Sequence, residues 1–177
     1  PTITGDKRFV KRFRREAEIV KQHLKHPHIV PVIAYGQTQG MVYLVMPFIR
    51  GETLSDRLIR AGLTEREAAL WIGQIADALH FAHRKGVIHR DIKPANIILT
   101  DSGEAMLSDF GLAREVEGSG TLTGSMLMGT PAFVSPEQAK GEKLDRRSDQ
   151  YSLGVILYLI STGRLPFDSD SPMTLVL

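Results

Sequence analysis

The centre of this chain carries residues whose types suit proton transfer and metal binding. Residues 89–96 read His-Arg-Asp-Ile-Lys-Pro-Ala-Asn, and Asp109 opens an Asp-Phe-Gly triplet further along. The Asp91 carboxylate can accept a proton from a hydroxyl, and Lys93 can neutralise an anionic group beside it. Asn96 and Asp109 offer the oxygen ligands that Mg²⁺ prefers. Singly, an aspartate can cap a turn and a lysine can be a solvated surface residue, but the spacing of all four favours one chemical site.

Two further motifs follow in order, Gly-Thr-Pro at residues 129–131 and Ser-Pro-Glu at residues 135–137. With residues 89–96 and 109–111, they resemble the catalytic loop, the metal-binding triplet and the substrate-docking segment of protein kinases. The Ser-Pro-Glu variant, followed by Gln-Ala, is most similar to the bacterial branch of that family. The resemblance implies a serine/threonine protein kinase, which transfers the γ-phosphate of ATP to Ser/Thr hydroxyls of proteins with Mg²⁺.

The resemblance also implies roles for single residues. Asp91 would be the catalytic base, and Lys93 would neutralise the transferring phosphoryl group. Asn96 and Asp109 would hold Mg²⁺ and thereby ATP, and Asn96 can also fix the loop by bonding Asp91. Thr130 would hydrogen-bond near Asp91 and Lys93. By the same resemblance, Lys93 and Thr130 together indicate Ser/Thr rather than Tyr substrates.

The nucleotide pocket is also assigned by resemblance. Met46, Pro47 and Ile49 occupy the hinge, where kinases hold adenine through backbone groups, and Ile98 would form the apolar floor. Plain core packing explains Met46 and Ile98 equally well. Glu16 would pair with a phosphate-holding lysine, although a surface glutamate among arginines remains an alternative.

A regulatory site is implied beside the catalytic loop. In kinases of this pattern Arg90 collects a phosphate from the activation loop. Thr121, Thr123 and Ser125 lie in the matching stretch, and residues 115–124 have the Gly, Ser and Thr content of a mobile loop. Phosphorylation there is expected to switch activity on, unless the stretch is only a flexible loop.

Hydrophobic periodicity predicts the elements that position these residues. Residues 6–24 have an amphipathic helical pattern, and residues 29–35 and 41–46 are typical of two strands around a polar turn. Thr64 begins a capping box ahead of a long helix, whose apolar stripe is Trp71, Ile75, Ala78, Leu79 and Ala82. Short strands are expected at 97–100 and 105–108, and a short helix after residues 52–53.

The last predicted element is a helix over residues 149–161. It carries apolar residues nearly all round and is therefore expected to be a buried central helix that ends at Gly163. By resemblance, Asp149 at its start anchors the catalytic loop from below. The fold class is α+β, an incomplete kinase-like bilobal fold. Residues 1–48 would form a partial N-lobe with one large helix and two strands, and residues 49–177 a partial, mainly helical C-lobe.

Composition limits the other functions. The chain has 177 residues, 42% of them hydrophobic, a net charge of +2 and no cysteine, which suits one domain in a reducing cytoplasm. Eight basic residues lie between Asp6 and Lys25, either as a solvated helix face or as a nucleic-acid arm, and we expect no nucleic-acid partner. The apolar run 151–160 is about half the ~20 residues of a membrane span. Expected partners are ATP, Ser/Thr-bearing proteins and a second copy during autophosphorylation.

Two family elements are absent from residues 1–177, the glycine-rich loop and the strand lysine that would pair with Glu16. The C-terminal helices of the family are absent too. The chain is therefore predicted to be a fragment that is inactive in isolation, from a protein that can carry a membrane anchor. A scaffold without phosphotransfer is the main rival, but such proteins usually lose the equivalents of Asp91, Asn96 or Asp109. A small-molecule phosphotransferase is disfavoured by the peptide-docking motifs.

Overall fold

The computed structural model describes residues 7–38, 41–110 and 131–167. In chain order the elements are α1 (Lys7–His23), β1 (Ala34–Thr38), β2 (Met41–Val45), β3 (Gly51–Thr53), α2 (Leu54–Arg60), α3 (Glu65–Arg84), a 3₁₀ helix (Pro94–Asn96), β4 (Ile97–Thr100), β5 (Ala105–Leu107), a second 3₁₀ helix (Pro131–Phe133), α5 (Pro136–Ala139) and α6 (Arg146–Thr162). Antiparallel pairing joins β1 to β2, and β4 to both β3 and β5. This mixture of small sheets and helices confirms the α+β prediction.

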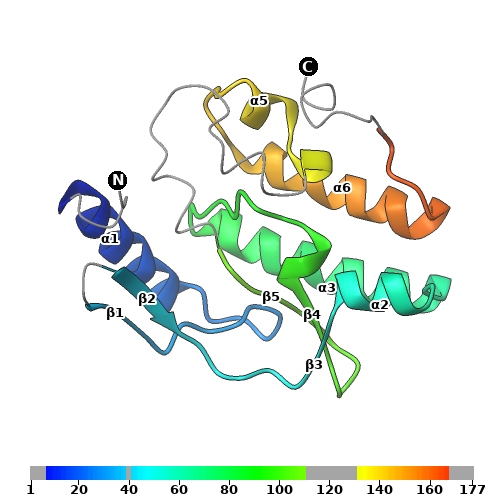
Figure 1. The fold of residues 1–177 in the computed structure, drawn as a ribbon, viewed down its shortest axis with the longest axis horizontal. Coiled ribbons are helices and arrows are strands. Elements are labelled where there is room, and N and C mark those ends of the chain that lie inside the picture. Colours follow the sequence, from blue (N-terminus) through cyan, green and yellow to red (C-terminus); the bar gives the residue numbers. More distant parts are fainter. Residues whose placement is uncertain (1–6, 39–40, 111–130, 168–177) are drawn as a thin grey trace.

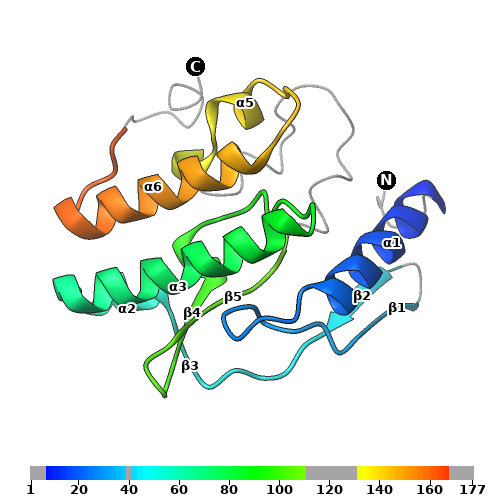
Figure 2. The same cartoon turned by 180° about the vertical axis from the view of Figure 1, so that it is seen from behind.

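The arrangement places α3 at the centre. Figures 1 and 2 show α3 lying between α6 and the strands β4 and β5, with α1, β1 and β2 grouped at one end. The buried stripe of α3 is the one that the sequence predicted, Trp71, Ile75, Ala78, Leu79 and Ala82. One long amphipathic helix thus supplies the apolar surface on which the segments around residues 89–110 are packed.

Helix α1 forms as its sequence pattern predicts. Phe13, Ala17, Val20 and Leu24 are buried along one face, at the spacing of a helical stripe. The Tyr35 hydroxyl donates to Glu18 at 2.5 Å and connects α1 to β1. This bond holds the pKa of Glu18 below its ordinary value.

The predicted strand over residues 29–35 is wrong in its bounds. Strand β1 begins only at Ala34 and continues through residues assigned to the turn. Upstream, the Val30 amide donates to the Leu107 carbonyl at 2.9 Å, and Ile29 forms an isolated parallel bridge to Leu107. The backbone around residues 28–30 therefore bonds to β5, and bonding to β2 begins only at Ile33, whose amide donates to Val45 at 2.8 Å. Single-sequence periodicity does not distinguish these partners.

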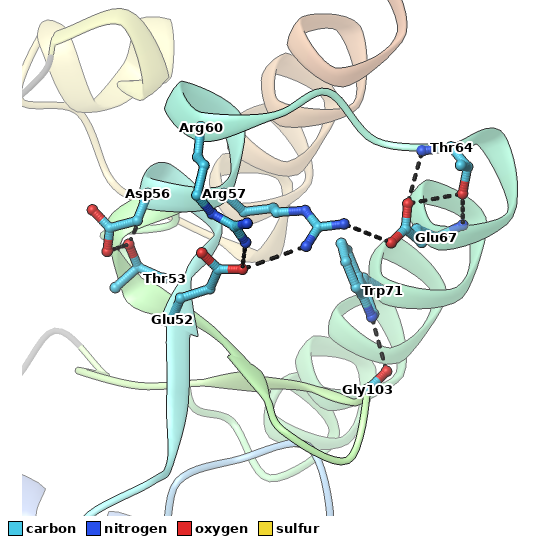
Figure 3. Close-up of polar contacts among 9 residues, drawn as sticks. All are labelled: Glu52, Thr53, Asp56, Arg57, Arg60, Thr64, Glu67, Trp71 and Gly103. Carbon is cyan, nitrogen blue, oxygen red and sulfur yellow. Dashed lines mark hydrogen bonds and ion pairs between the residues drawn. The ribbon is translucent and has the colours of Figure 1, made fainter.

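Polar contacts join β3, α2 and α3 (Figure 3). The Arg57 guanidinium lies 2.9 Å from Glu67 and 3.5 Å from Glu52, and Arg60 contacts Glu52 as well. Trp71 donates its indole N–H to the Gly103 carbonyl at 2.9 Å, which links α3 to the β4–β5 turn. These contacts fix α2 against α3, the helix on which the segments around residues 89–110 are packed.

Glycine is required where the chain enters β3. Gly51 has a φ of +146°, and a Cβ there would lie 2.0 Å from the Leu99 carbonyl oxygen. Any side chain would clash with the β4 backbone, so Gly51 permits the close pairing of β3 with β4.

The capping box of α3 gives a stability prediction. The Thr64 hydroxyl accepts from the Glu67 amide, and the Glu67 carboxylate accepts from the Thr64 amide, which keeps the pKa of Glu67 low. Thr64→Ala is expected to lower the free energy of unfolding by about 1 kcal/mol, measured by urea denaturation of the full-length protein. Thr64→Ser retains the hydroxyl and serves as the control. Equal losses in both variants would contradict a role for this cap.

Helix α6 is longer and less buried than the sequence predicts. It begins at Arg146, with Asp145 as its N-cap, and ends at Gly163 in the left-handed conformation, as expected. Ser152, Val155 and Ile156 are buried, but Leu157 and Tyr158 are each 46% exposed. The prediction of burial all round is wrong here because α3 and the segment 133–139 cover one face, and no described element covers the other.

Candidate active site

Residues 89–96, which we call the catalytic loop after the kinase motif that they resemble, are fixed by a buried carboxylate on α6. Asp149 is 1% exposed, and its oxygens accept the backbone N–H groups of His89 and Arg90, each at 2.8 Å. His83 on α3 places its Nε2 2.7 Å from the same carboxylate. The predicted anchoring by Asp149 is therefore present, and it joins α3, α6 and the loop.

His89 is buried and contacts both the loop that carries Asp91 and the segment that carries Asp109. Its Nδ1 accepts the Asp91 amide at 3.2 Å, so Nε2 carries the proton and donates to the Ser108 carbonyl at 2.8 Å. Burial lowers the pKa of His89, which favours this neutral tautomer. The Phe110 ring lies against it with a centroid distance of 4.6 Å. The imidazole thus fixes the separation between the catalytic loop and the Asp-Phe-Gly triplet.

The structure brings two predicted site residues, Lys93 and Asn96, into contact with a third, Asp91. Lys93 Nζ lies 2.9 Å from Asp91 Oδ2. Asn96 Nδ2 donates to the Asp91 carbonyl at 2.8 Å and to Asp91 Oδ2 at 3.1 Å. The expected bond between Asn96 and Asp91 is present, and the carboxylate has a fixed orientation beside a cation.

Asp109 is joined to the same cluster through the main chain. The Asn96 carbonyl accepts the Ser108 amide at 2.9 Å and the Ser108 hydroxyl at 3.1 Å. Asn96 therefore contacts Asp91 through its side chain and the residue before Asp109 through its backbone. Arg90 and Asp109 have positive φ values of 67° and 56°. Such conformations persist only when the surroundings hold them, and they are common at functional sites.

The donor set at this site fits Mg²⁺ held jointly with phosphate groups. Asp109 is exposed and offers a carboxylate, and Asn96, whose Nδ2 donates to Asp91, adds an amide oxygen to the donor set. Among the described residues, no group of three His, Cys, Asp or Glu side chains could hold a metal ion. Mg²⁺ commonly binds through one or two protein ligands plus substrate phosphates. The residues present suit that mode and not an all-protein cage.

The predicted nucleotide-pocket residues lie on β4 and in the segment that leads into β3. Met46, Pro47 and Ile49 are half-buried in the segment between β2 and β3. Ile98 is half-buried on β4, opposite Thr53 on β3. The segment 46–50 thus runs directly into the strand that pairs with β4. Glu16 is half-buried on α1.

Four predicted residues lie outside the described part of the chain, namely Thr121, Thr123, Ser125 and Thr130. Conversely, two contacts at the catalytic loop were not predicted. One is the contact of His83 with Asp149, and the other is a hydrogen bond from Gln138 to the Arg90 carbonyl. Ser135 and Gln138 have the spacing of a capping box, which was a usable signal for the local bond but not for the contact with Arg90.

Comparison with known proteins gives consistent results. A family model described as protein kinase domain matches residues 3–176. The chain is 45% identical to a probable serine/threonine-protein kinase of Streptomyces coelicolor and 40% identical to another of Clostridium perfringens, over 97% and 96% of its length. It is 42% identical to the serine/threonine-protein kinase PknB of Mycobacterium tuberculosis, over 97% of its length.

The matched region is a limited part of those relatives. The chain spans 26%, 25% and 28% of the three proteins, respectively, or about a quarter of each. Within the described residues, no helix combines the length and hydropathy that a membrane crossing requires.

Proposed function

Because this chain belongs to the protein kinase family and resembles its bacterial serine/threonine members, we propose that it forms the catalytic centre of a Mg·ATP-dependent serine/threonine protein kinase. The family in general uses ATP and Mg²⁺. The observation that carries the proposal is the Asp91 cluster, in which one carboxylate is held by Lys93 at 2.9 Å and by Asn96 at 3.1 Å. Such an arrangement suits proton removal beside a transferring anionic group.

The residues of this chain act by position and charge. ATP, as the substrate, would supply the γ-phosphoryl group, and Mg²⁺ held by Asn96 and Asp109 would supply positive charge beside the phosphates. The Asp91 carboxylate orients the substrate hydroxyl and accepts its proton as the new O–P bond forms and the bond to the β,γ-bridging oxygen breaks, which releases ADP. Lys93 balances the negative charge on the transferring group, and Asn96 holds Asp91 in place. Asn96 and Asp109 would hold the metal.

Nucleotide binding extends this centre toward the hinge. Ile49 would hold adenine through its backbone N–H and carbonyl, and Pro47 through its carbonyl alone, so the missing N–H of proline costs nothing there. Met46 would be the gatekeeper, and Ile98 would pack beneath the ring. Glu16 would pair with a lysine that contacts the phosphates. In this proposal residues 1–48 belong to the N-lobe and residues 49–177 to the C-lobe, so the nucleotide lies at the boundary.

Residues beside Asp91 would also set the substrate class and the regulation of the kinase. Lys93 and Thr130 would select Ser/Thr hydroxyls, and the protein partners would be substrates that carry them. Arg90 would bind phosphate on Thr121, Thr123 or Ser125 after autophosphorylation between two copies. The lack of cysteine and the need for ATP suit a cytoplasmic catalytic centre.

The direct test is phosphoryl transfer from γ-labelled Mg·ATP by the full-length protein, with the products read by phosphopeptide mass spectrometry. We expect phosphate on Ser or Thr of a protein substrate, and on Thr121 or Thr123 of the kinase. Nucleotide binding without any transfer would indicate a scaffold and would overturn the proposal.

Asp109→Asn should weaken ATP binding only when Mg²⁺ is present. The change removes the hard anionic ligand but preserves size, so we expect an increase of about 10-fold or more in the Kd of Mg·ATP. Isothermal titration with and without Mg²⁺ measures the difference, and exposed Asp101→Asn is the control. Identical affinities in the variant and the unmodified protein would remove Asp109 from the metal site.

A further inference from the structure

Gln138 connects the segment after the docking motif to the catalytic loop. Its side chain is buried, with 6% exposure. Nε2 donates to the Arg90 carbonyl at 2.8 Å, and Oε1 accepts the Ser135 amide at 3.1 Å. Both ends of one carboxamide are therefore used, one within the first turn of α5 and one on a residue 48 positions earlier.

The Arg90 carbonyl belongs to the peptide unit whose N–H is that of Asp91. Gln138 holds the oxygen of this unit, and His89 Nδ1 accepts its N–H at 3.2 Å. The preceding amide, that of Arg90, donates to Asp149 at 2.8 Å. Because a peptide unit is planar, holding its oxygen and its N–H fixes the direction of the N–Cα bond that follows. These contacts therefore position the Cα from which the Asp91 side chain projects.

The backbone at Arg90 needs such support. Its φ of 67° lies in the left-handed region. This conformation costs a non-glycine residue free energy, which contacts with neighbouring groups must offset. Gln138 also borders the same small cavity as Asp91 and Lys93, whose volume is about 10 Å³. Loss of Gln138 Nε2 would remove this hydrogen bond from the Arg90 carbonyl. That carbonyl belongs to the residue directly before Asp91, whose carboxylate is the proposed base.

We infer that Gln138 is a positioning residue for Asp91, through which the placement of α5 controls the geometry of phosphoryl transfer. This inference rests on the proposed function. Misplacement of a reacting group by ~1 Å can cost about 100-fold in rate. ATP binding is set by other residues, so the effect should fall on kcat and leave the KM for ATP nearly unchanged.

The test uses two variants of the full-length protein. Gln138→Glu keeps the acceptor for the Ser135 amide but places an oxygen against the Arg90 carbonyl, and Gln138→Met keeps the length of the side chain without polar atoms. Both should lower kcat by about 10- to 100-fold and change the KM for ATP by less than about 2-fold.

Ser148→Ala is the matched control. The Ser148 hydroxyl on α6 donates to Glu137 on α5, so the change also removes a buried bond of α5 but spares the contact with Arg90. It should lower the melting temperature as the Gln138 variants do, with kcat within about 3-fold of the unmodified protein. If all three variants lose kcat equally, Gln138 is only structural and the inference is overturned.

Hydrogen exchange provides a measurement that is independent of turnover. In Gln138→Glu the amides of residues 89–92 should exchange faster, whereas those of α3 should not change. If the unmodified protein is active and both Gln138 variants have normal kcat and normal exchange, this inference alone is overturned. An unmodified protein that binds Mg·ATP but transfers no phosphate would overturn the proposed function as well.

Discussion

Asp91→Asn in the full-length protein is expected to lower kcat by about 1,000-fold, the middle of the range for a lost general base. The substitution preserves the size of the side chain and retains an oxygen that can accept from Asn96, now 3.1 Å from the carboxylate. It removes the basic oxygen and the ion pair with Lys93. The fold and the proposed metal ligands Asn96 and Asp109 should be unaffected, so the Kd of Mg·ATP should change by less than about 2-fold.

Steady-state kinetics and isothermal titration of the same preparation separate these two quantities. Asp101→Asn, an exposed change in the β4–β5 turn, controls for the loss of one negative charge and should leave kcat unchanged. Unaltered turnover in Asp91→Asn would show that Asp91 is not the base. A parallel loss of nucleotide affinity would instead assign it to binding.

Asp149→Ala should destabilise the protein by about 3–5 kcal/mol, because a buried carboxylate and its bonds are removed. The N–H groups of His89 and Arg90 would each lose a partner at 2.8 Å, and His83 would lose its contact. Since these amides hold the catalytic loop, the kcat of the molecules that remain folded should fall by about 100-fold as well.

Asp145→Ala is the matched control on the same helix. Asp145 caps α6 by accepting the Arg147 amide but is exposed, and its loss should cost only about 1 kcal/mol without a change in kcat. Urea denaturation and initial rates below the unfolding transition measure both effects. Equal destabilisation by the two variants would contradict the anchoring role of Asp149.

Sequence patterns predicted a large part of this fold because the relevant signals are local. The helical stripe of α3, the Thr64 capping box and the left-handed end of α6 at Gly163 each depend on residues within a few positions of one another. The start of β1 and the burial of α6 were predicted wrongly. Both depend on partners that are distant in the sequence, and propensity carries no information on those.

The active site divides in the same way. The types and spacing of Asp91, Lys93, Asn96 and Asp109 indicated the protein kinase family, which the comparisons with known proteins show, and they suggested the chemistry that we propose, since the motif can be recognised without coordinates. Only the tertiary structure showed that Gln138 bonds the Arg90 carbonyl and that His83 contacts Asp149. These contacts join residues 48 and 66 positions apart, and packing between α3, α5, α6 and the loop decides which polar groups meet once they are buried.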